Sequence, residues 1–171
     1  MFVTNHVLAG ASIGLVLRRR PVAAFTAGVA SHLAMDAVPH FDCRPATFLT
    51  VARRDGVLGL AVIAAVAAAS DRPVAPVLAG MAGAALLDLN KPAHHFFGFS
   101  PFPKPVDRFH AAIQQGKTSP ERLRQELTSG VVLATVAAVL ISRSRRRRRH
   151  AAQDADESVP VSPSPNSASG E

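Results

Sequence analysis

Short apolar segments, separated by charged or proline-containing turns, constrain the fold of this chain more than any other feature of its sequence. A soluble protein of 171 residues rarely combines 48 % hydrophobic with only 18 % charged residues. We therefore predict an all-α fold, a polytopic membrane helical bundle of about five short transmembrane helices, arranged as two hairpins plus a last helix. The segments are residues 3–17, 21–39, 56–70, 73–89 and 127–142.

These segments are short for membrane spans. A perpendicular span takes about 20 residues, so several of them must recruit flanking residues or thin the bilayer locally. The alternative is a soluble bundle, because apolar stretches of about 10–14 residues are often buried core helices. Small residues at helix-facing spacing, such as Gly10 and Gly14, would let helix backbones approach closely. Ser119 before Pro120 predicts a capped helix start that leads to the last span.

Basic residues predict the orientation. Arg143 and the run 145–149 follow the last apolar segment, and such clusters stay in the cytoplasm. We predict a multi-pass protein of the inner cell membrane, with residues 1–142 as the membrane domain and 90–126 as an extramembrane loop within it. Residues 143–171 are expected to form a polybasic and then disordered cytoplasmic tail. Five spans place the N-terminus outside, whereas four spans with one amphipathic segment would reverse it.

Ionisable side chains recur every four residues in the second apolar segment, at His32, Asp36 and His40. At 3.6 residues per turn they would lie within about 80° of one another on one helical stripe. Each such group costs at least about 2.5–3.5 kcal/mol at mid-membrane depth, so the stripe needs partners, water or a metal ion. Imidazoles and carboxylates suit a divalent transition metal, with zinc expected first and manganese or iron as alternatives. The other interpretation is that Asp36 hydrogen-bonds a histidine and joins helices.

The five-span topology brings further potential metal ligands to the same, outer membrane surface. Most also have a structural interpretation; Asp55, for example, would be a charge at a helix start. We expect seven or more potential ligands to converge on one aqueous mouth, with His32 about two helical turns deeper. The others are His6, His40, Asp42, Asp55, Asp88, His94, His95, Asp107 and His110.

A metal site of this kind suits hydrolysis, because a metal ion lowers the pKa of bound water and polarises an ester or phosphate. Asp36, Asp42 and Asp55 are the candidate catalytic carboxylates, acting as proton acceptors. The sequence has no GxSxG, P-loop, dinucleotide-binding or HExxH motif, which leaves serine hydrolases, NTPases and zincins without support. The single cysteine, Cys43, excludes an internal disulfide framework and a Cys-rich zinc module.

Three sequence elements resemble a bacterial family of predicted membrane-bound metal-dependent hydrolases, the LexA-regulated inner-membrane group. They are HVLAGA from His6, SHLAMDAVPHFD from Ser31, and Asp55 before an apolar helix. A more distant likeness is to zinc-dependent phospholipase C. The resemblance covers approximately the first 60 residues. It implies hydrolysis of a phosphoester or lipid-like substrate, with a metal region formed by His6, His32, Asp36, His40 and Asp42.

The alternative function is a non-enzymatic integral membrane protein, whose His/Asp stripe is structural or is a metal-binding or transport site. Ligands gathered at one water-facing mouth favour hydrolysis, whereas polar residues that continue to the inner surface favour transport. The expected partners are membrane lipid and a lipid or phosphoester substrate. Basic residues cluster at segment ends rather than along a helix face, which argues against nucleic acid despite a net charge of +7. A polybasic tail would instead contact anionic lipid.

Overall fold

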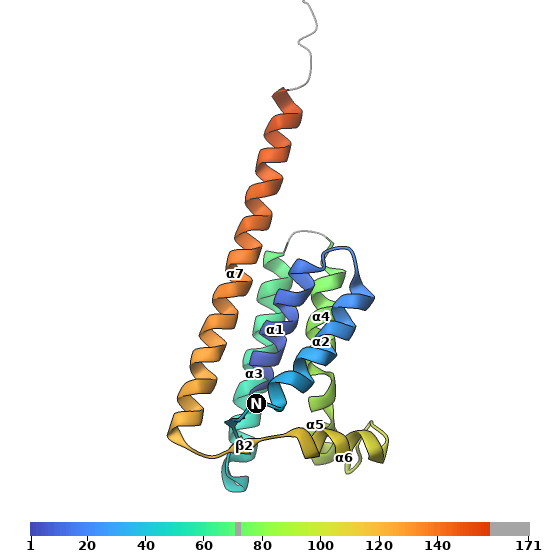
Figure 1. The fold of residues 1–171 in the computed structure, drawn as a ribbon, viewed down its shortest axis with the longest axis vertical. Coiled ribbons are helices and arrows are strands. Elements are labelled where there is room, and N and C mark those ends of the chain that lie inside the picture. The colour runs from blue at the N-terminus through green and yellow to red at the C-terminus, as the bar shows by residue number, and fades with distance from the viewer. Residues whose placement is uncertain (71–72, 158–171) are drawn as a thin grey trace, which may run out of the picture.

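The structure is a computed structural model that describes residues 1–70 and 73–157, and this part of the chain is mostly helical, as predicted. The long helices run roughly along one direction, and short elements gather at the lower end of the bundle (Figure 1). The elements are α1 (Val3–Val16), α2 (Pro21–Asp36), β1 (His40–Phe41), η1 (Pro45–Thr47), α3 (Phe48–Ala69), α4 (Ala75–Ala85), η2 (Leu86–Leu89), α5 (Asn90–Phe97), α6 (Lys104–Ile113), β2 (Gly116–Lys117) and α7 (Pro120–Glu157).

Glycines allow α4 to pack directly against both α1 and α2. A Cβ atom on Gly10 of α1 or on Gly28 of α2 would overlap the backbone carbonyl of Gly80, and one on Gly14 would overlap the carbonyl of Pro76. The close approach predicted for Gly10 and Gly14 is therefore confirmed. Around this contact, the apolar core is filled by Val7, Ala11, Leu15, Val66, Val77, Met81, Ala137 and Ile141.

The second predicted hairpin does not pack as a pair. Helix α4 makes its main contacts with α1 and α2, whereas α3 packs on α1 and has few contacts with α4. Small residues explain the difference, because Gly80 and Gly83 of α4 fit against α1 and α2 at distances that larger side chains would prevent. The turn residues 71–72 between α3 and α4 lie outside the described residues.

Helix α2 ends earlier than the apolar pattern predicted. It stops at Asp36, and His40 lies in the short strand β1 instead of one turn further along the helix. Pro39 gives the reason, because a proline disfavours helical backbone at the residue before it, here Val38. The predicted stripe of His32, Asp36 and His40 on one helix is therefore wrong for His40, although His32 and Asp36 remain one turn apart.

Helix α7 is longer than the predicted last span. It begins at Pro120, where the Ser119 hydroxyl accepts a hydrogen bond from the Arg122 N–H, as the predicted cap requires. It then continues through the polybasic run to Glu157, because arginine, alanine and glutamine are strong helix formers and neither glycine nor proline interrupts them. The tail predicted to be disordered is thus helical as far as Glu157, and its remaining part, 158–171, lies outside the described residues.

Among the described residues, one helix is long and apolar enough to cross a membrane, and it covers residues Pro120–Asp154 of α7. Helix α1 is apolar but shorter. An arrangement with about five spans therefore stays a prediction. The polybasic part of α7 projects beyond the upper end of the bundle, opposite to the end that carries β2, α5 and α6 (Figure 1).

A two-residue parallel pairing of β1 with β2 joins distant parts of the chain at the lower end. His40 pairs with Gly116 and Phe41 with Lys117. Next to this pairing, the Gln115 N–H donates a hydrogen bond to the backbone carbonyl of Asp36, over 3.3 Å. These bonds hold residues 115–117 against the C-terminus of α2, and α6, which precedes them, is thereby placed beside it.

Candidate metal centre

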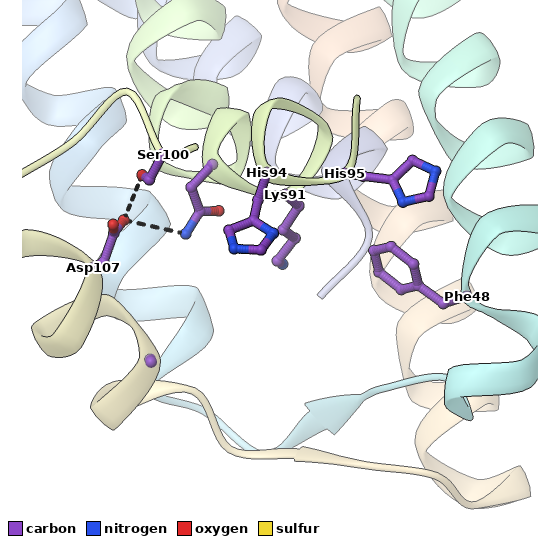
Figure 2. A pocket seen from close by; sticks show the side chains of 8 residues that line it. Phe48, Lys91, His94, His95, Ser100 and Asp107 are labelled. Carbon is purple, nitrogen blue, oxygen red and sulfur yellow. Dashed lines mark hydrogen bonds between the residues drawn. The ribbon is translucent and has the colours of Figure 1, made fainter. Parts of the chain in front are cut away.

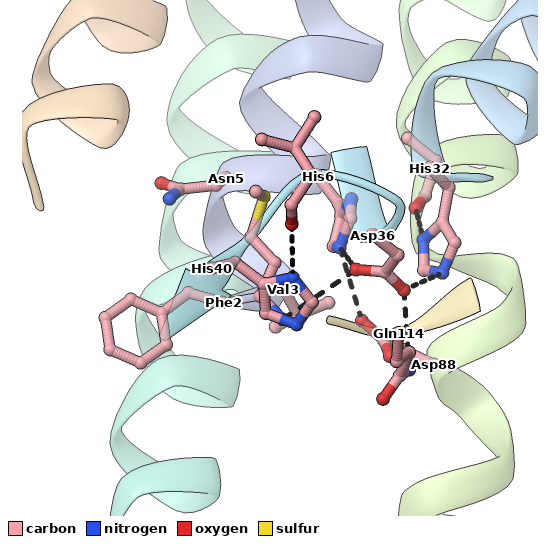
Figure 3. A network of polar contacts seen from close by, with 12 residues as sticks. Phe2, Val3, Asn5, His6, His32, Asp36, His40, Asp88 and Gln114 are labelled. Carbon is pink, nitrogen blue, oxygen red and sulfur yellow. Dashed lines mark hydrogen bonds and ion pairs between the residues drawn. The ribbon is translucent and has the colours of Figure 1, made fainter. Parts of the chain in front are cut away.

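Asp36, the last residue of α2, lies at the centre of a buried cluster of histidines. Its side chain has no exposed surface. Its Oδ2 atom lies 3.0 Å from Nε2 of His110 and 3.2 Å from Nε2 of His32, and its Oδ1 atom lies 3.3 Å from Nε2 of His6. The three histidines come from α6, α2 and α1, and Figure 3 shows the rings of His6 and His32 pointing toward this carboxylate.

Local structure explains how each element supplies its ligand. His32 and Asp36 are one turn apart on α2, so both face the same neighbours. Close packing of α1, α2 and α4 stacks the rings of His6 and His32, with centroids 4.1 Å apart. Asp88 belongs to η2, which continues α4 downward to the same level, and its Oδ2 atom lies 3.9 Å from Nε2 of His6.

The hydrogen bonds of His32 determine which of its nitrogens is available as a ligand. Nδ1 lies 2.6 Å from the carbonyl oxygen of Ala84, and only a protonated Nδ1 can donate to that oxygen. In the neutral ring, Nε2 then carries a lone pair. A backbone carbonyl commonly orients metal-binding histidines in this way.

Two imidazole nitrogens face each other in the cluster. Nε2 of His32 lies 3.0 Å from Nε2 of His110, and the Gln114 side-chain amide lies 3.1 Å from the same His110 atom. A proton or a metal ion is needed between two facing nitrogens. A tetrahedral ion with ligands at about 2.1 Å separates neighbouring ligand atoms by about 3.4 Å, which is close to the spacing here.

The cluster fits a metal ion by its donor atoms. His32, Asp36, Asp88 and His110 are all buried, and each offers a ligand atom that lies within 4.8 Å of the others. Both ring nitrogens of His6 and the Oδ1 atom of Asp36 are buried without a hydrogen-bond partner. Buried polar atoms are seldom left unpaired, so this His/Asp group could hold a metal ion.

Lys91 holds the outer oxygen of Asp88. Its Nζ atom lies 2.7 Å from Asp88 Oδ1. Burial by itself lowers the pKa of Lys91, but the facing Asp88 carboxylate outweighs burial and raises that pKa above its usual value. Lys91 is therefore charged at neutral pH, and it leaves the Oδ2 atom of Asp88 directed toward His6.

A cavity of about 710 Å³ adjoins the cluster. Asp88, Lys91 and Gln114 form part of its wall next to the buried histidines. The rest of the wall is mainly apolar and comes from β1, η1, the start of α3 and α5. Its larger apolar side chains are Phe2, Phe41, Phe48, Leu49, Leu89 and Phe96.

A smaller hollow of about 480 Å³ lies beside it and shares Lys91. Asp107 lines this hollow and is fixed there by the Ser100 hydroxyl, which donates to its Oδ1 atom over 2.9 Å (Figure 2). His94 and His95 line it as well and are exposed. Asp107, His94 and His95 therefore belong to the surface of the 90–126 segment rather than to the histidine cluster.

The structure brings together His6, His32 and Asp36 of the predicted metal ligands, but it uses His40 and Asp42 differently. His40 is buried and its Nδ1–H donates to the carbonyl of Val38 over 2.9 Å. Asp42 is exposed, and its Oδ1 atom accepts the N–H of Cys43. In the described part of the chain, neither of the two forms a hydrogen bond or ion pair with Asp36.

Asp55, a predicted catalytic carboxylate, caps helix α1. Its Oδ2 atom accepts the N–H of Val3 over 2.6 Å, and its Oδ1 atom accepts the N–H and the hydroxyl of Thr4. Both oxygens thus bind the first turn of a neighbouring helix, which is favourable because helix N-termini attract negative charge. These contacts support a structural role for Asp55 as a helix cap.

Asp88 and His110 belong to the cluster, but the sequence did not predict them as metal ligands. Both were recognised as residues of the expected mouth, since each lies at or beyond the end of the fourth apolar segment. Nothing in the local sequence of His110 distinguishes it from His94 or His95. The pairing of β1 with β2, which involves residues 76 positions apart, is what places α6 against the cluster.

Comparisons with protein-family models, with curated proteins and with solved structures found no match to this chain.

Proposed function

We propose that this protein is a membrane-bound metal-dependent hydrolase that acts on a phosphoester or lipid-like substrate. The observation that carries the proposal is the convergence of His32, Asp36, Asp88 and His110 beside a cavity large enough for a small amphiphile. The resemblance of the first 60 residues to membrane-bound metal-dependent hydrolases supports the same conclusion.

The chemistry divides between the metal ion and the residues around it. A bound zinc, manganese or iron ion supplies an acidified water and polarises an ester or phosphate oxygen. His32, His110, Asp36 and Asp88 would hold metal at this centre, and Lys91 places a positive charge on the wall of the cavity that an anionic phosphate would enter. Of the three predicted proton acceptors, Asp42 lines the cavity without capping a helix, so it is the carboxylate that we assign to this role.

Apolar surface supports a membrane location. Large apolar side chains are exposed along α2, α3 and α7, among them Val22 at 78 %, Leu60 at 69 % and Val131 at 67 %. Surfaces of this kind mark contact with lipid or with another protein. The apolar wall of the cavity also suits the acyl chains of a substrate that resembles membrane lipid.

A non-enzymatic metal-binding protein is the second candidate, and the complete burial of His6, His32 and Asp36 favours it. Asp88, Gln114 and the amino group of Met1 connect this buried set to the cavity wall. A transport path receives no support, because apolar residues such as Val7, Ala11 and Met81 fill the bundle beyond the cluster.

Metal content tests the proposal. Protein purified in detergent and supplied with zinc or manganese should retain metal after gel filtration, as measured by mass spectrometry. The double variant His32→Ala, Asp36→Ala should lose it. His150→Ala removes an exposed histidine far from the cluster, in the polybasic part of α7, and should bind metal as the wild type does.

Hydrolysis is then measured on a chromogenic phosphodiester and on phospholipid in mixed micelles. We expect turnover by the wild type and by His150→Ala, and none by the double variant. Stoichiometric metal without turnover of any phosphoester or lipid would favour the non-enzymatic candidate. No retained metal in the wild type would exclude both.

A further inference from the structure

The two oxygens of Asp36 face different histidines. Oδ2 lies between His32 and His110, at 3.2 Å and 3.0 Å from their Nε2 atoms. Oδ1 points to the opposite side, where Nε2 of His6 lies 3.3 Å away (Figure 3). A carboxylate arranged in this way offers one ligand atom to each of two possible metal positions, which we call the first and the second place.

The first place is bounded by His32 and His110. Their Nε2 atoms face each other over 3.0 Å, and each lies near Asp36 Oδ2. The hydrogen bond from His32 Nδ1 to Ala84 leaves a lone pair on His32 Nε2 that is directed into this place. Two nitrogens and one oxygen therefore converge at spacings that suit one ion.

The second place is bounded by His6, which a single ion in the first place does not explain. His6 has no exposed surface, and neither of its ring nitrogens has a hydrogen-bond partner. Oδ1 of Asp36 is also without a hydrogen-bond partner. At 3.3 Å, this buried imidazole nitrogen and carboxylate oxygen need either a proton or a metal ion that they share, and a metal ion would serve as the partner of both.

Asp88 completes the second place. Its Oδ2 atom lies 3.9 Å from Nε2 of His6, while Lys91 binds its Oδ1 atom over 2.7 Å. Of the two buried carboxylates, Asp88 pairs with Lys91, and Asp36 has the amino group of Met1 3.7 Å from its Oδ1 atom. Asp88 also lines the cavity, so this second place is the one nearer to an incoming substrate.

We infer that Asp36 bridges two metal ions, the first held by His32 and His110 and the second by His6 and Asp88. The inference deepens the proposed function and rests on it. Centres with two ions about 3.5–4 Å apart are common in enzymes that hydrolyse phosphoesters, because the two ions stabilise the attacking and the leaving oxygen. The stacked rings of His6 and His32, with centroids 4.1 Å apart, direct the two histidines to neighbouring positions of that kind. A phosphoester is the substrate class that we expect from this pairing.

Counting ions distinguishes this centre from a single site. The wild type loaded with manganese should hold two ions per chain by mass spectrometry, and His6→Ala and His110→Ala should each hold one. Asp36→Ala should hold none, because the bridge serves both places. His150→Ala is the matched control and should hold two.

Electron paramagnetic resonance gives a second readout that needs only the wild type. Two manganese ions that share a carboxylate are exchange-coupled, and the spectrum should show the coupled pair. His6→Ala should show an isolated ion, and His6→Gln serves if the alanine variant does not fold. One ion with an uncoupled spectrum in the wild type would overturn the inference and leave the proposed function standing, whereas no bound ion would overturn both.

Discussion

At the scale of single residues, the same side-chain type has different roles according to its partners. Asp36 and Asp55 both lie near the lower end of the bundle, and both were candidate catalytic groups. The Asp36 carboxylate contacts nitrogens of three histidines, the Gln114 amide and the amino group of Met1, whereas both oxygens of Asp55 bind the backbone of α1. Sequence spacing does not reveal this difference, because it depends on which groups of the neighbouring helices each carboxylate meets.

Asp55→Ala tests the structural role of that residue. Removing a carboxylate cap should destabilise the protein by about 1–2 kcal/mol, because two N–H groups of α1 lose their acceptor. Thermal unfolding in detergent should show a midpoint lower by about 2–8 °C. Metal content should be unchanged.

Asp42→Ala is the matched control for this measurement, because Asp42 is exposed and caps no helix. Its unfolding midpoint should stay close to that of the wild type. If Asp55→Ala kept the wild-type midpoint but lost hydrolysis while retaining its metal, Asp55 would be a catalytic group instead.

At the scale of elements, glycines determine which helices meet. Gly80 of α4 approaches the backbone of α1 at Gly10 so closely that any side chain would overlap the carbonyl of that residue. This contact sets the height of α1 relative to α4, and η2 continues α4 to Asp88. The distance between His6 and Asp88 therefore depends on helix packing that takes place more than one turn away.

Gly80→Ala should disturb both stability and metal binding. Overpacking a backbone contact costs about 1–3 kcal/mol or more, and separating α1 from α4 would move His6 away from Asp88. We expect a lower unfolding midpoint by differential scanning fluorimetry and weaker manganese affinity by titration.

Gly56→Ala is the control, because a Cβ atom at this position of α3 meets nothing within 4 Å. It should raise stability by up to about 1 kcal/mol, since alanine favours a helix more than glycine does. A Gly80→Ala protein as stable as Gly56→Ala would show that the α1 and α4 contact is looser than described.

At the scale of the whole molecule, the polybasic part of α7 and the His/Asp cluster lie at opposite ends of the bundle. Arg145 binds the carbonyl of Ala69 at the upper end of α3, and the polybasic part of α7 continues beyond it (Figure 1). The cluster and its cavity lie at the lower end. A membrane orientation with the basic end in the cytoplasm would therefore expose the cavity on the outer side.

The single cysteine provides a test of that orientation. Cys43 lines the cavity, and burial, with the nearby Asp42, raises the pKa of its thiol, so labelling is best done at alkaline pH. In intact spheroplasts, a membrane-impermeant maleimide should label Cys43. A cysteine placed by Arg146→Cys in a Cys43→Ser background should react only after lysis. The reverse pattern would place the cavity in the cytoplasm.

The helical content, the close approach of α1 at its glycines and the presence of histidine and aspartate in apolar surroundings could all be predicted from the sequence. These features follow from local properties, because helix propensity, side-chain size and polarity belong to each residue and its near neighbours. His32 and Asp36 were found for the same reason, since they are one turn apart on one helix.

Which other residues join His32 and Asp36 depends on how the whole chain folds. His110 and Asp88 reach Asp36 through the packing of α4 and through the β1–β2 pairing, while the N-terminus of α1 recruits Asp55 as a cap. These outcomes depend on contacts between residues more than 50 positions apart. Local patterns contain no information about such contacts, because their geometry is set by how whole helices pack.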